Sequence, residues 1–315
     1  MSDAASGREM SVPDTMAGFA IGRAAGASGG FGGVVPPGEQ GGGSSPREIT
    51  VALPKLTGAA VLSVRAFRCW LLAYRRTWRS SVWSSVFGPL FYLGAMGYGL
   101  GSLVDKNGTA ALGGVPYVVF VAPAVLAVQA MNSGMSNALF PVFGAVHWNR
   151  IYLAARATML RPGDIYRGHL LFITMRITMN SACFVVLMAA FGLIRSPWAA
   201  LLLPAAVLTG FAFATPCAAW AVTLEHDTQM NYPIRFGAVP LMLFSATFFP
   251  ITQLPGWIRP VAYVTPLWHG VALCRGLSLG DLSAGAVAIH VGYLAGLAAV
   301  GLWAGNRTYR RRLYV

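Results

Sequence analysis

Charged residues are scarce in this chain. They make up 10% of the 315 residues, whereas 56% of the residues are hydrophobic. A soluble globular domain carries about 25% charged residues, so the composition excludes that class and indicates a membrane protein. The formal net charge is nevertheless +13, from 23 basic and 10 acidic residues. In a membrane protein such an excess must be compared with the positive-inside rule before a nucleic-acid partner is considered.

Lysine is nearly absent, and this excludes a phosphate-binding Walker loop. Such a loop ends in Gly-Lys followed by Ser or Thr. The chain has only two lysines, of which Lys55 follows Pro54 and Lys106 follows Asp105. We therefore expect no cofactor on this chain, so that any ATP and Mg²⁺ would be held by a partner subunit.

Paired cysteines are lacking as well. Cys69, Cys183, Cys217 and Cys274 show no paired spacing, and Cys183 and Cys217 fall inside apolar runs. This pattern favours small buried hydrophobic side chains over a disulfide or a metal site. We expect neither.

Residues 1–54 differ in kind from the rest of the chain. Twelve glycines fall before residue 45. Such a segment cannot bury enough apolar surface to offset the entropy of its backbone, which predicts a disordered cytoplasmic tail. It also has no continuous apolar core of the kind that indicates a secretory signal peptide.

Six apolar runs are long enough to cross a membrane, for which a helix needs about 20 mostly apolar residues. The runs cover residues 81–104, 116–140, 169–194, 198–224, 236–253 and 284–304. None of the ten carboxylates lies inside them, in agreement with the high cost of a charge in the bilayer. The sequence therefore predicts an all-α polytopic membrane protein with six transmembrane helices in residues 55–315.

The basic residues are distributed unequally between the two sides of these runs. Fourteen share one side: Arg65, Arg68, Arg75, Arg76, Arg79, Arg150, Arg156, Arg161, Arg167, Arg235, Arg307, Arg310, Arg311 and Arg312. Only Lys106, Arg195, Arg259 and Arg275 fall on the other side. The positive-inside rule then puts both termini in the cytoplasm. Topology explains the net charge, and we expect no nucleic-acid partner.

Residues 56–79 combine an apolar side with a basic side. Val61, Val64, Leu71 and Trp78 recur near helical spacing among five arginines. The pattern predicts an amphipathic helix on the inner surface of the membrane. A simple anchor for the first span is the alternative, and the two roles are compatible.

The connection between the second and third runs, which we call the elbow, is the most charged internal segment. Residues that tolerate a helix extend over about 146–162. We expect Pro162 to end this helix and Asp164 to N-cap the third span. A short helix parallel to the membrane is suited to transmit force from a cytoplasmic partner. A solvated loop whose arginines only fix topology is the alternative.

Residues 254–283 follow the fifth run on the outer side. Pro255, Pro260 and Pro266 divide them into pieces too short to span, and their Trp and Tyr residues suit the membrane–water interface. We expect one or two short helices that dip into the outer leaflet. Backbone at that depth must be covered by protein or line a wet cavity.

Four stretches of the sequence carry a family resemblance: FGPLFYLGAMGYGLGSLV, AVQAMNSGM, PVFGAVHWNRIYLAARATMLRPGDIYRGH and FFPITQLPGWIRPVAYVTPLWHGVALCRGL. Over about residues 55–315 the chain resembles a type 2 ABC exporter permease of the NodJ-like and DrrB-like lipo-oligosaccharide and drug-export branch. The resemblance implies that residues 56–79 are the interface helix, the elbow is the coupling helix, and residues 254–283 are a re-entrant hairpin. It also implies a permease dimer, of two identical or two sibling chains, seated on two ATPase subunits.

The resemblance and the placement of polar residues together give three sets of candidate site residues. An ATPase partner would push on the elbow through Trp148, Asn149, Arg150, Arg156, Arg161 and Asp164. A secondary cytoplasmic contact would use Glu225, His226 and Asp227. A substrate path between the second and fifth spans would pass Gln129, Asn132, Ser133, Ser245, Thr247, Phe248 and Phe249. Each polar path residue could instead bond between packed helices.

This path carries no fixed charge, which favours an amphiphilic or hydrophobic cargo such as a drug, an antibiotic or a lipid-linked saccharide. A charged substrate captured by arginines at the inner surface is the alternative.

Two other functions compete with export. An ion-coupled secondary transporter usually keeps ionisable residues in the membrane. The spans offer only His169, Arg176 and His290. The side chains of His169 and Arg176 can snorkel toward the cytoplasmic surface. For His290, a packed and hydrogen-bonded side chain is the favoured interpretation. An intramembrane enzyme would have to use Glu225-His226-Asp227, but no H-E-x-x-H spacing exists and neighbouring side chains point apart. We therefore expect a transport subunit without catalytic residues.

Overall fold

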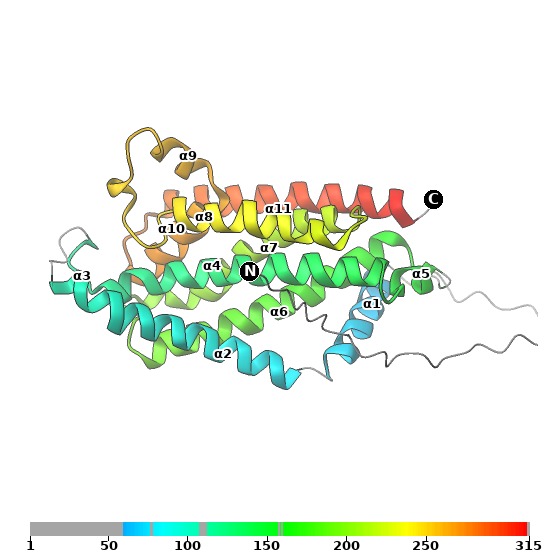
Figure 1. The fold of residues 1–315 in the computed structure, drawn as a ribbon, viewed down its shortest axis with the longest axis horizontal. Helices are drawn as coiled ribbons and strands as arrows, with labels where there is room; N and C mark the ends of the chain where they lie inside the picture. Colours follow the sequence, from blue (N-terminus) through cyan, green and yellow to red (C-terminus); the bar gives the residue numbers. More distant parts are fainter. Residues whose placement is uncertain (1–58, 76–77, 107–111, 157, 159, 314–315) are drawn as a thin grey trace, which may run out of the picture. The chain divides into compact units, whose positions relative to one another are not determined.

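The computed structural model describes residues 59–75, 78–106, 112–156, 158 and 160–313. The tail expected over residues 1–54 lies outside them. In this described part every regular element is helical (Figure 1). The elements are α1 (Ala59–Tyr74), α2 (Trp78–Gly94), η1 (Ala95–Gly101), α3 (Ser102–Lys106), α4 (Tyr117–Val146), α5 (Ile151–Arg156), α6 (Pro162–Ala190), η3 (Pro197–Leu201), α7 (Leu202–Ala221), η4 (Asp227–Asn231), η5 (Pro233–Ala238), α8 (Val239–Phe244), η6 (Ile251–Gln253), α9 (Arg259–Val264), α10 (Pro266–Leu279) and α11 (Ala284–Leu313).

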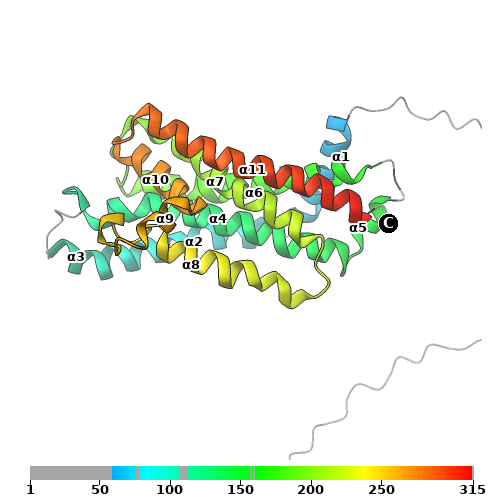
Figure 2. The same cartoon turned by 90° about the horizontal axis from the view of Figure 1, so that it is seen from above.

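Among the described residues, four helices are long and apolar enough to span a membrane: α4, α6, α7 with the preceding η3, and α11. They correspond to the second, third, fourth and sixth apolar runs, and they pack side by side along their lengths (Figures 1 and 2). In the most apolar 18-residue stretch of α4, 83% of the stretch is buried inside the protein, whereas in the corresponding stretch of α11 only 22% is buried. α4 is therefore the central helix, and α11 presents most of its apolar surface outward.

Glycines let α4 and α7 approach closely. Gly134 and Gly210 lie against each other's helix, and a Cβ added to Gly210 would lie 2.6 Å from the carbonyl oxygen of Ala130. No larger residue fits without separating the two backbones. Close contact through small residues is typical of membrane bundles, because van der Waals packing drives helix association there.

The first and fifth apolar runs are helical as well, but neither is a regular α-helix throughout. α2, η1 and α3 form one helical run from Trp78 to Lys106, with π-helix in its middle. The bounds expected for the fifth run, 236–253, are wrong. Its helix begins with η4 and ends with α8 at Phe244. Ala246 then takes a φ of 54°, a left-handed conformation that turns the chain.

The elbow holds a shorter helix than its composition predicts. α4 continues to Val146, residues 147–150 turn, and α5 covers only Ile151–Arg156, so the helix expected over 146–162 is wrong at both ends. Pro162 begins α6 rather than ending a helix, because the first helical position needs no N–H. Asp164 is not the N-cap. It is the third residue of α6, and its carboxylate accepts the N–H of Arg161 at 3.3 Å.

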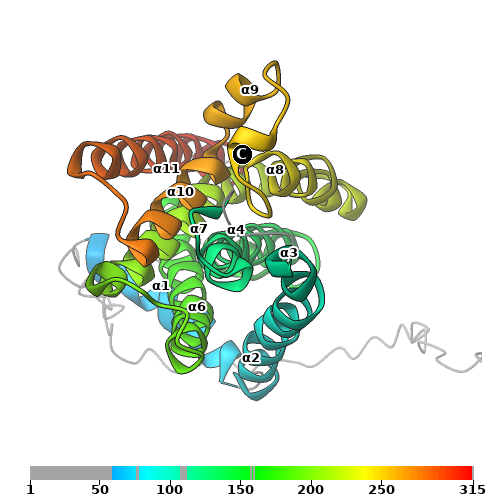
Figure 3. The same cartoon turned by 90° about the vertical axis from the view of Figure 1, so that its left-hand side faces the viewer.

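Helix α1 lies against α6 at Gly168, where a Cβ would come within 2.8 Å of the carbonyl oxygen of Ser63. α1 accounts for Ala59–Tyr74 of the interface helix expected over 56–79, and residues 78–79 already belong to α2. Residues 56–58 and 76–77 lie outside the described ranges. Viewed end-on, α1 and α11 lie on the opposite side of α4 from α2 and α8 (Figure 3).

Residues 254–283 contain α9 and α10 at the end of the bundle away from the elbow (Figure 1). α10 packs against α4, α7 and α11, and its Leu267 and Cys274 are fully buried. This helix is thus covered by protein.

Candidate functional site

A cluster of rings joins the elbow helix to three other helices. We call Tyr152, His169, Trp70 and Tyr309 the elbow joint. Tyr152 of α5 is 1% exposed and is hydrogen-bonded to Nδ1 of His169 on α6 at 2.5 Å. The His169 ring stacks on the Trp70 ring of α1, with the two ring centroids 4.1 Å apart. The ring centroid of Tyr309 on α11 lies 5.8 Å from that of Tyr152. A displacement of α5 would therefore act on α1, α6 and α11 together.

The elbow joint was not predicted, because its members come from four separate parts of the sequence. The expectation that His169 snorkels is wrong, since its side chain is buried and hydrogen-bonded inside the protein. Burial also raises the pKa of Tyr152, so its hydroxyl stays neutral. A tyrosine within an otherwise basic elbow was the one signal in the sequence.

The side chains expected to couple to a partner fall into two groups. Four are exposed, with Trp148 at 60%: Trp148, Asn149, Arg150 and Arg161. Asp164 is buried and holds the start of α6, so it is not available to a partner. The side chain of Arg156 lies outside the described part. The four exposed residues lie in the same connection between α4 and α6 as Tyr152 of the elbow joint.

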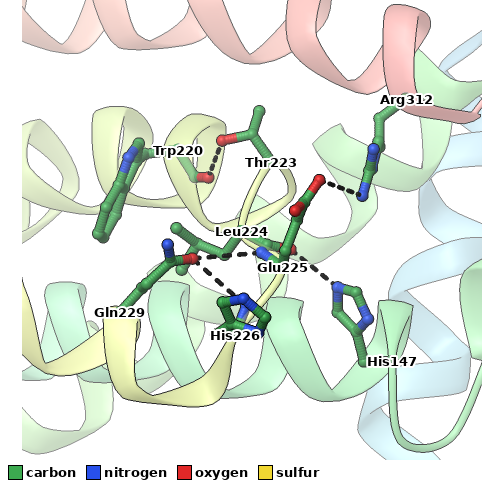
Figure 4. Close-up of polar contacts among 8 residues, drawn as sticks. All are labelled: His147, Trp220, Thr223, Leu224, Glu225, His226, Gln229 and Arg312. Carbon is green, nitrogen blue, oxygen red and sulfur yellow. Dashed lines mark hydrogen bonds and ion pairs between the residues drawn. The ribbon is translucent and has the colours of Figure 1, made fainter.

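The connection after α7 ties the ends of three helices together (Figure 4). Nε2 of His147, which follows α4, donates to the carbonyl oxygen of Leu224 at 2.9 Å. The carboxylate of Glu225 lies 3.9 Å from a guanidinium nitrogen of Arg312 on α11. The Gln229 side-chain oxygen accepts the N–H groups of Glu225 and His226, both at 3.3 Å.

These contacts bear on the polar cluster Glu225-His226-Asp227. Glu225 is engaged with Arg312, and both side chains are largely exposed, so their pairing adds little stability. His226 and Asp227 are exposed at the surface. Among the described residues no three potential metal ligands come together. The cluster lies at the elbow end of the bundle, where a partner can reach it.

The structure brings four of the predicted path residues together. A cavity of about 210 Å³ is lined by Gln129 and Asn132 of α4, by Thr247 and Phe248, and by Tyr92 of α2. We call it the path cavity. The amides of Gln129 and Asn132 bond to no other described residue, and the hydroxyl of Thr247 is buried without a partner. Unpaired polar groups in an apolar wall can bind a polar part of a ligand.

The other predicted path residues are engaged elsewhere. The Ser133 hydroxyl accepts from the amide of Asn180 on α6 at 2.9 Å, and Ser245 bonds to Thr265 at 3.0 Å. Both are helix-to-helix or loop contacts of the kind that competes with a path role. Phe249 is half-buried outside the lining of the cavity.

An arginine fixes the turn that supplies Thr247. Arg275 of α10 donates to the carbonyl oxygens of Ala246 at 3.0 Å and Thr247 at 3.1 Å. It also donates to the carbonyl oxygen of Phe120 at 3.2 Å, with its guanidinium 3.8 Å from the Phe120 ring. Burial lowers the pKa of Arg275 to about 10, so it remains charged at neutral pH. The sequence marked Arg275 only as one of four basic residues on the far side.

The histidine considered as a relay is packed against a second histidine. Nδ1 of His290 lies 2.9 Å from Nδ1 of His269 on α10, and the His269 ring stacks on Tyr293. His290 thus makes a contact between α10 and α11.

Known proteins resemble the chain over most of its length. Nodulation protein J of Sinorhizobium fredii is 29% identical over 263 residues, which cover 81% of this chain and 97% of the relative. Nodulation protein J of Rhizobium leguminosarum bv. trifolii is 31% identical over 254 residues, with 78% and 94% covered. Nodulation protein J of Rhizobium meliloti is 28% identical over 253 residues, which cover 78% of this chain and 94% of the relative.

The family model described as ABC-2 type transporter matches residues 62–278, from α1 to α10. This region contains the elbow joint except Tyr309, the path cavity and Arg275. The match covers more than half of the chain, and the apolar helices agree with a membrane transport component. The chain therefore belongs to the ABC-2 type transporter family.

Proposed function

We propose that this chain is the six-span permease subunit of an ATP-driven exporter in a bacterial cytoplasmic membrane, with both termini in the cytoplasm. The run from Trp78 to Lys106 exceeds the roughly 20 residues that a span needs, and the run ending at Phe244 would be the fifth span. The residues after it, with α9 and α10, would form the re-entrant hairpin. The chain would act with a second permease and two ATPase subunits, which would hold ATP and Mg²⁺.

The elbow joint is the observation that carries this proposal. The surface at Trp148, Arg150 and Arg161 would receive the ATPase, with Glu225, His226 and Asp227 as a further contact. A push on α5 would pass through Tyr152 and His169 into α1, α6 and α11. Since α6 and α11 pack on α7, and α7 packs on α4, this motion would reach the helix that lines the path cavity.

The path cavity supports an amphiphilic or hydrophobic cargo. Its volume of about 210 Å³ is below the range of roughly 300–1,000 Å³ found for whole ligand sites. We propose that it holds only a polar uncharged part of the cargo, and that a facing cavity in the second protomer completes the path. A drug or a lipid-linked saccharide fits this description.

The proposal is tested first by affinity purification of the full-length protein from its native membrane. We expect a Walker-motif ATPase to co-purify in equal amount, and mass spectrometry would identify it together with any second permease. If the chain repeatedly came out alone and well folded, the proposal would fail. The His269–His290 pair would then be the place to look for ion coupling.

Charge reversal at the elbow tests the coupling role. The double variant Arg150→Glu, Arg161→Glu should leave the protein in the membrane and abolish cargo-stimulated ATP hydrolysis, because it inverts the charge of the contact surface. The matched control is Arg310→Glu, Arg311→Glu, which reverses two exposed charges at the end of α11. Normal stimulation in the elbow variant would make the elbow a topological loop only.

A further inference from the structure

A long apolar groove runs between α1, α6, α7 and α11. Its volume is about 780 Å³, within the roughly 300–1,000 Å³ of ligand sites. Leu171 of α6, Val207 and Phe211 of α7, and Leu302 of α11 contribute to its walls. The path cavity is instead lined by residues of α2, α4 and α8, by the turn that follows α8 and by Phe184 of α6, so the two sites share no residue. The groove would therefore stay open to lipid in a dimer whose two path cavities face each other.

The groove has a single charged residue in its wall. Arg167, in the second turn of α6, is exposed and makes no hydrogen bond or ion pair with another described residue. From the adjoining α1 the groove is lined by Ser63 and Val64, whereas Arg65 lines a different pocket against α5. The groove thus carries one cation, Arg167, in an otherwise uncharged and mostly apolar wall.

This distribution of charge matches one kind of occupant. A peptide segment would bring backbone N–H and C=O groups that the apolar walls cannot pair. A phospholipid brings acyl chains for the walls and a phosphate for a guanidinium, which binds phosphate through paired N–H donors. Anionic lipid also concentrates in the cytoplasmic leaflet, where the positive-inside rule puts this end of α6.

We infer that the groove binds one anionic phospholipid, with its phosphate at Arg167 and an acyl chain along Leu171, Val207 and Phe211. The lipid would lie between α1 and the helices α7 and α11, whereas the direct support of α1 comes from α6 at Gly168. It would thereby help to hold α1 on the bundle. The inference requires only that the chain lies in a membrane, so it does not depend on export.

The test is native mass spectrometry of the full-length protein released from nanodiscs of phosphatidylglycerol and phosphatidylcholine in equal amounts. We expect one phosphatidylglycerol to remain on each chain. Arg167→Gln should lower its retention on the order of tenfold, because a hydrogen-bonded charge is lost. Arg167→Lys should restore part of it. Arg235→Gln, which removes an exposed arginine of η5 outside the groove, is the matched control and should behave like wild type.

A second variant separates the lipid from its head group. Leu171→Trp fills the groove and keeps Arg167, so retention should fall although the charge is unchanged; Leu171 is 47% exposed, and folding should be preserved. If Leu171→Trp had no effect and excess inorganic phosphate displaced the bound species, the site would be a phosphate site and the inference wrong. Equal retention of both lipids, unchanged retention in Arg167→Gln, or a bound species other than phospholipid would also overturn it.

Discussion

The two ends of the helix bundle are held together by different chemistry. At the elbow end, neutral rings join α5 to α1, α6 and α11, and the Tyr152–His169 hydrogen bond orients them. At the far end, one half-buried cation, Arg275, joins α10 to the start of α4 and to the turn at Ala246 and Thr247. At the elbow end the stabilising contacts are shared among several rings, whereas at the far end Arg275 alone makes three hydrogen bonds. The far end should therefore be the more fragile of the two.

The path cavity differs from both ends, because it gathers three polar side chains around an empty volume. Thr247 belongs to the turn that Arg275 fixes, while Gln129 and Asn132 lie on the central helix. Elsewhere in the described part, Ser133 and Asn180 bond to each other, whereas the buried hydroxyls of Ser181 and Ser278 have no partner. Unpaired polar groups at a cavity cost stability and are retained where a ligand uses them.

Loss of the Arg275 guanidinium should have the largest effect. Arg275→Leu leaves three carbonyl oxygens without their donor, and we expect the free energy of unfolding to fall by about 3 kcal/mol. Denaturant titration of the purified protein in detergent measures this. Arg195→Leu, at an exposed arginine of the same side, should change it by less than about 0.5 kcal/mol. Equal effects of the two variants would contradict the bridging role of Arg275.

The elbow joint should lose less stability when one hydrogen bond is removed than the far end loses in Arg275→Leu. Tyr152→Phe keeps the ring and leaves Nδ1 of His169 buried without its partner, so we expect a loss of about 1–2 kcal/mol. Cargo-stimulated ATP hydrolysis should fall more than basal hydrolysis. Tyr232→Phe, at an exposed tyrosine, is the control for both measurements. Stimulation that survives in Tyr152→Phe would mean that force bypasses this bond.

A substitution in the path cavity should change the stability in the opposite direction. Asn132→Leu removes an unpaired amide from an apolar wall, so stability should stay level or rise by up to about 1 kcal/mol while export falls. Asn137→Leu on the same helix removes an amide that donates to the Ser133 carbonyl at 2.7 Å, and should destabilise by about 1 kcal/mol. Thermal unfolding and a transport assay together distinguish the two. Destabilisation by Asn132→Leu would make that amide a packing group.

Several predictions from local sequence are wrong because contacts between residues far apart in the sequence decided the structure there. Proline was expected to end the elbow helix, but at position 162 it begins α6, because the chain on its N-terminal side is already turned. The fifth run ends at Phe244 because Arg275, some thirty residues later in the chain, holds the following turn. The burial of His169 depends on Trp70 and Tyr152, which approach it only in the folded bundle.

The sequence by itself determined the membrane class, the four long apolar helices and the family. Hydrophobic run length, the absence of carboxylates and the uneven placement of arginines are properties of the chain that need no contacts. Only the tertiary structure decided which helix is central, which polar side chains are paired, and that a tyrosine and a histidine form the elbow joint. Those outcomes depend on burial and on atoms a few ångströms apart, and residues far separated in the sequence supply both.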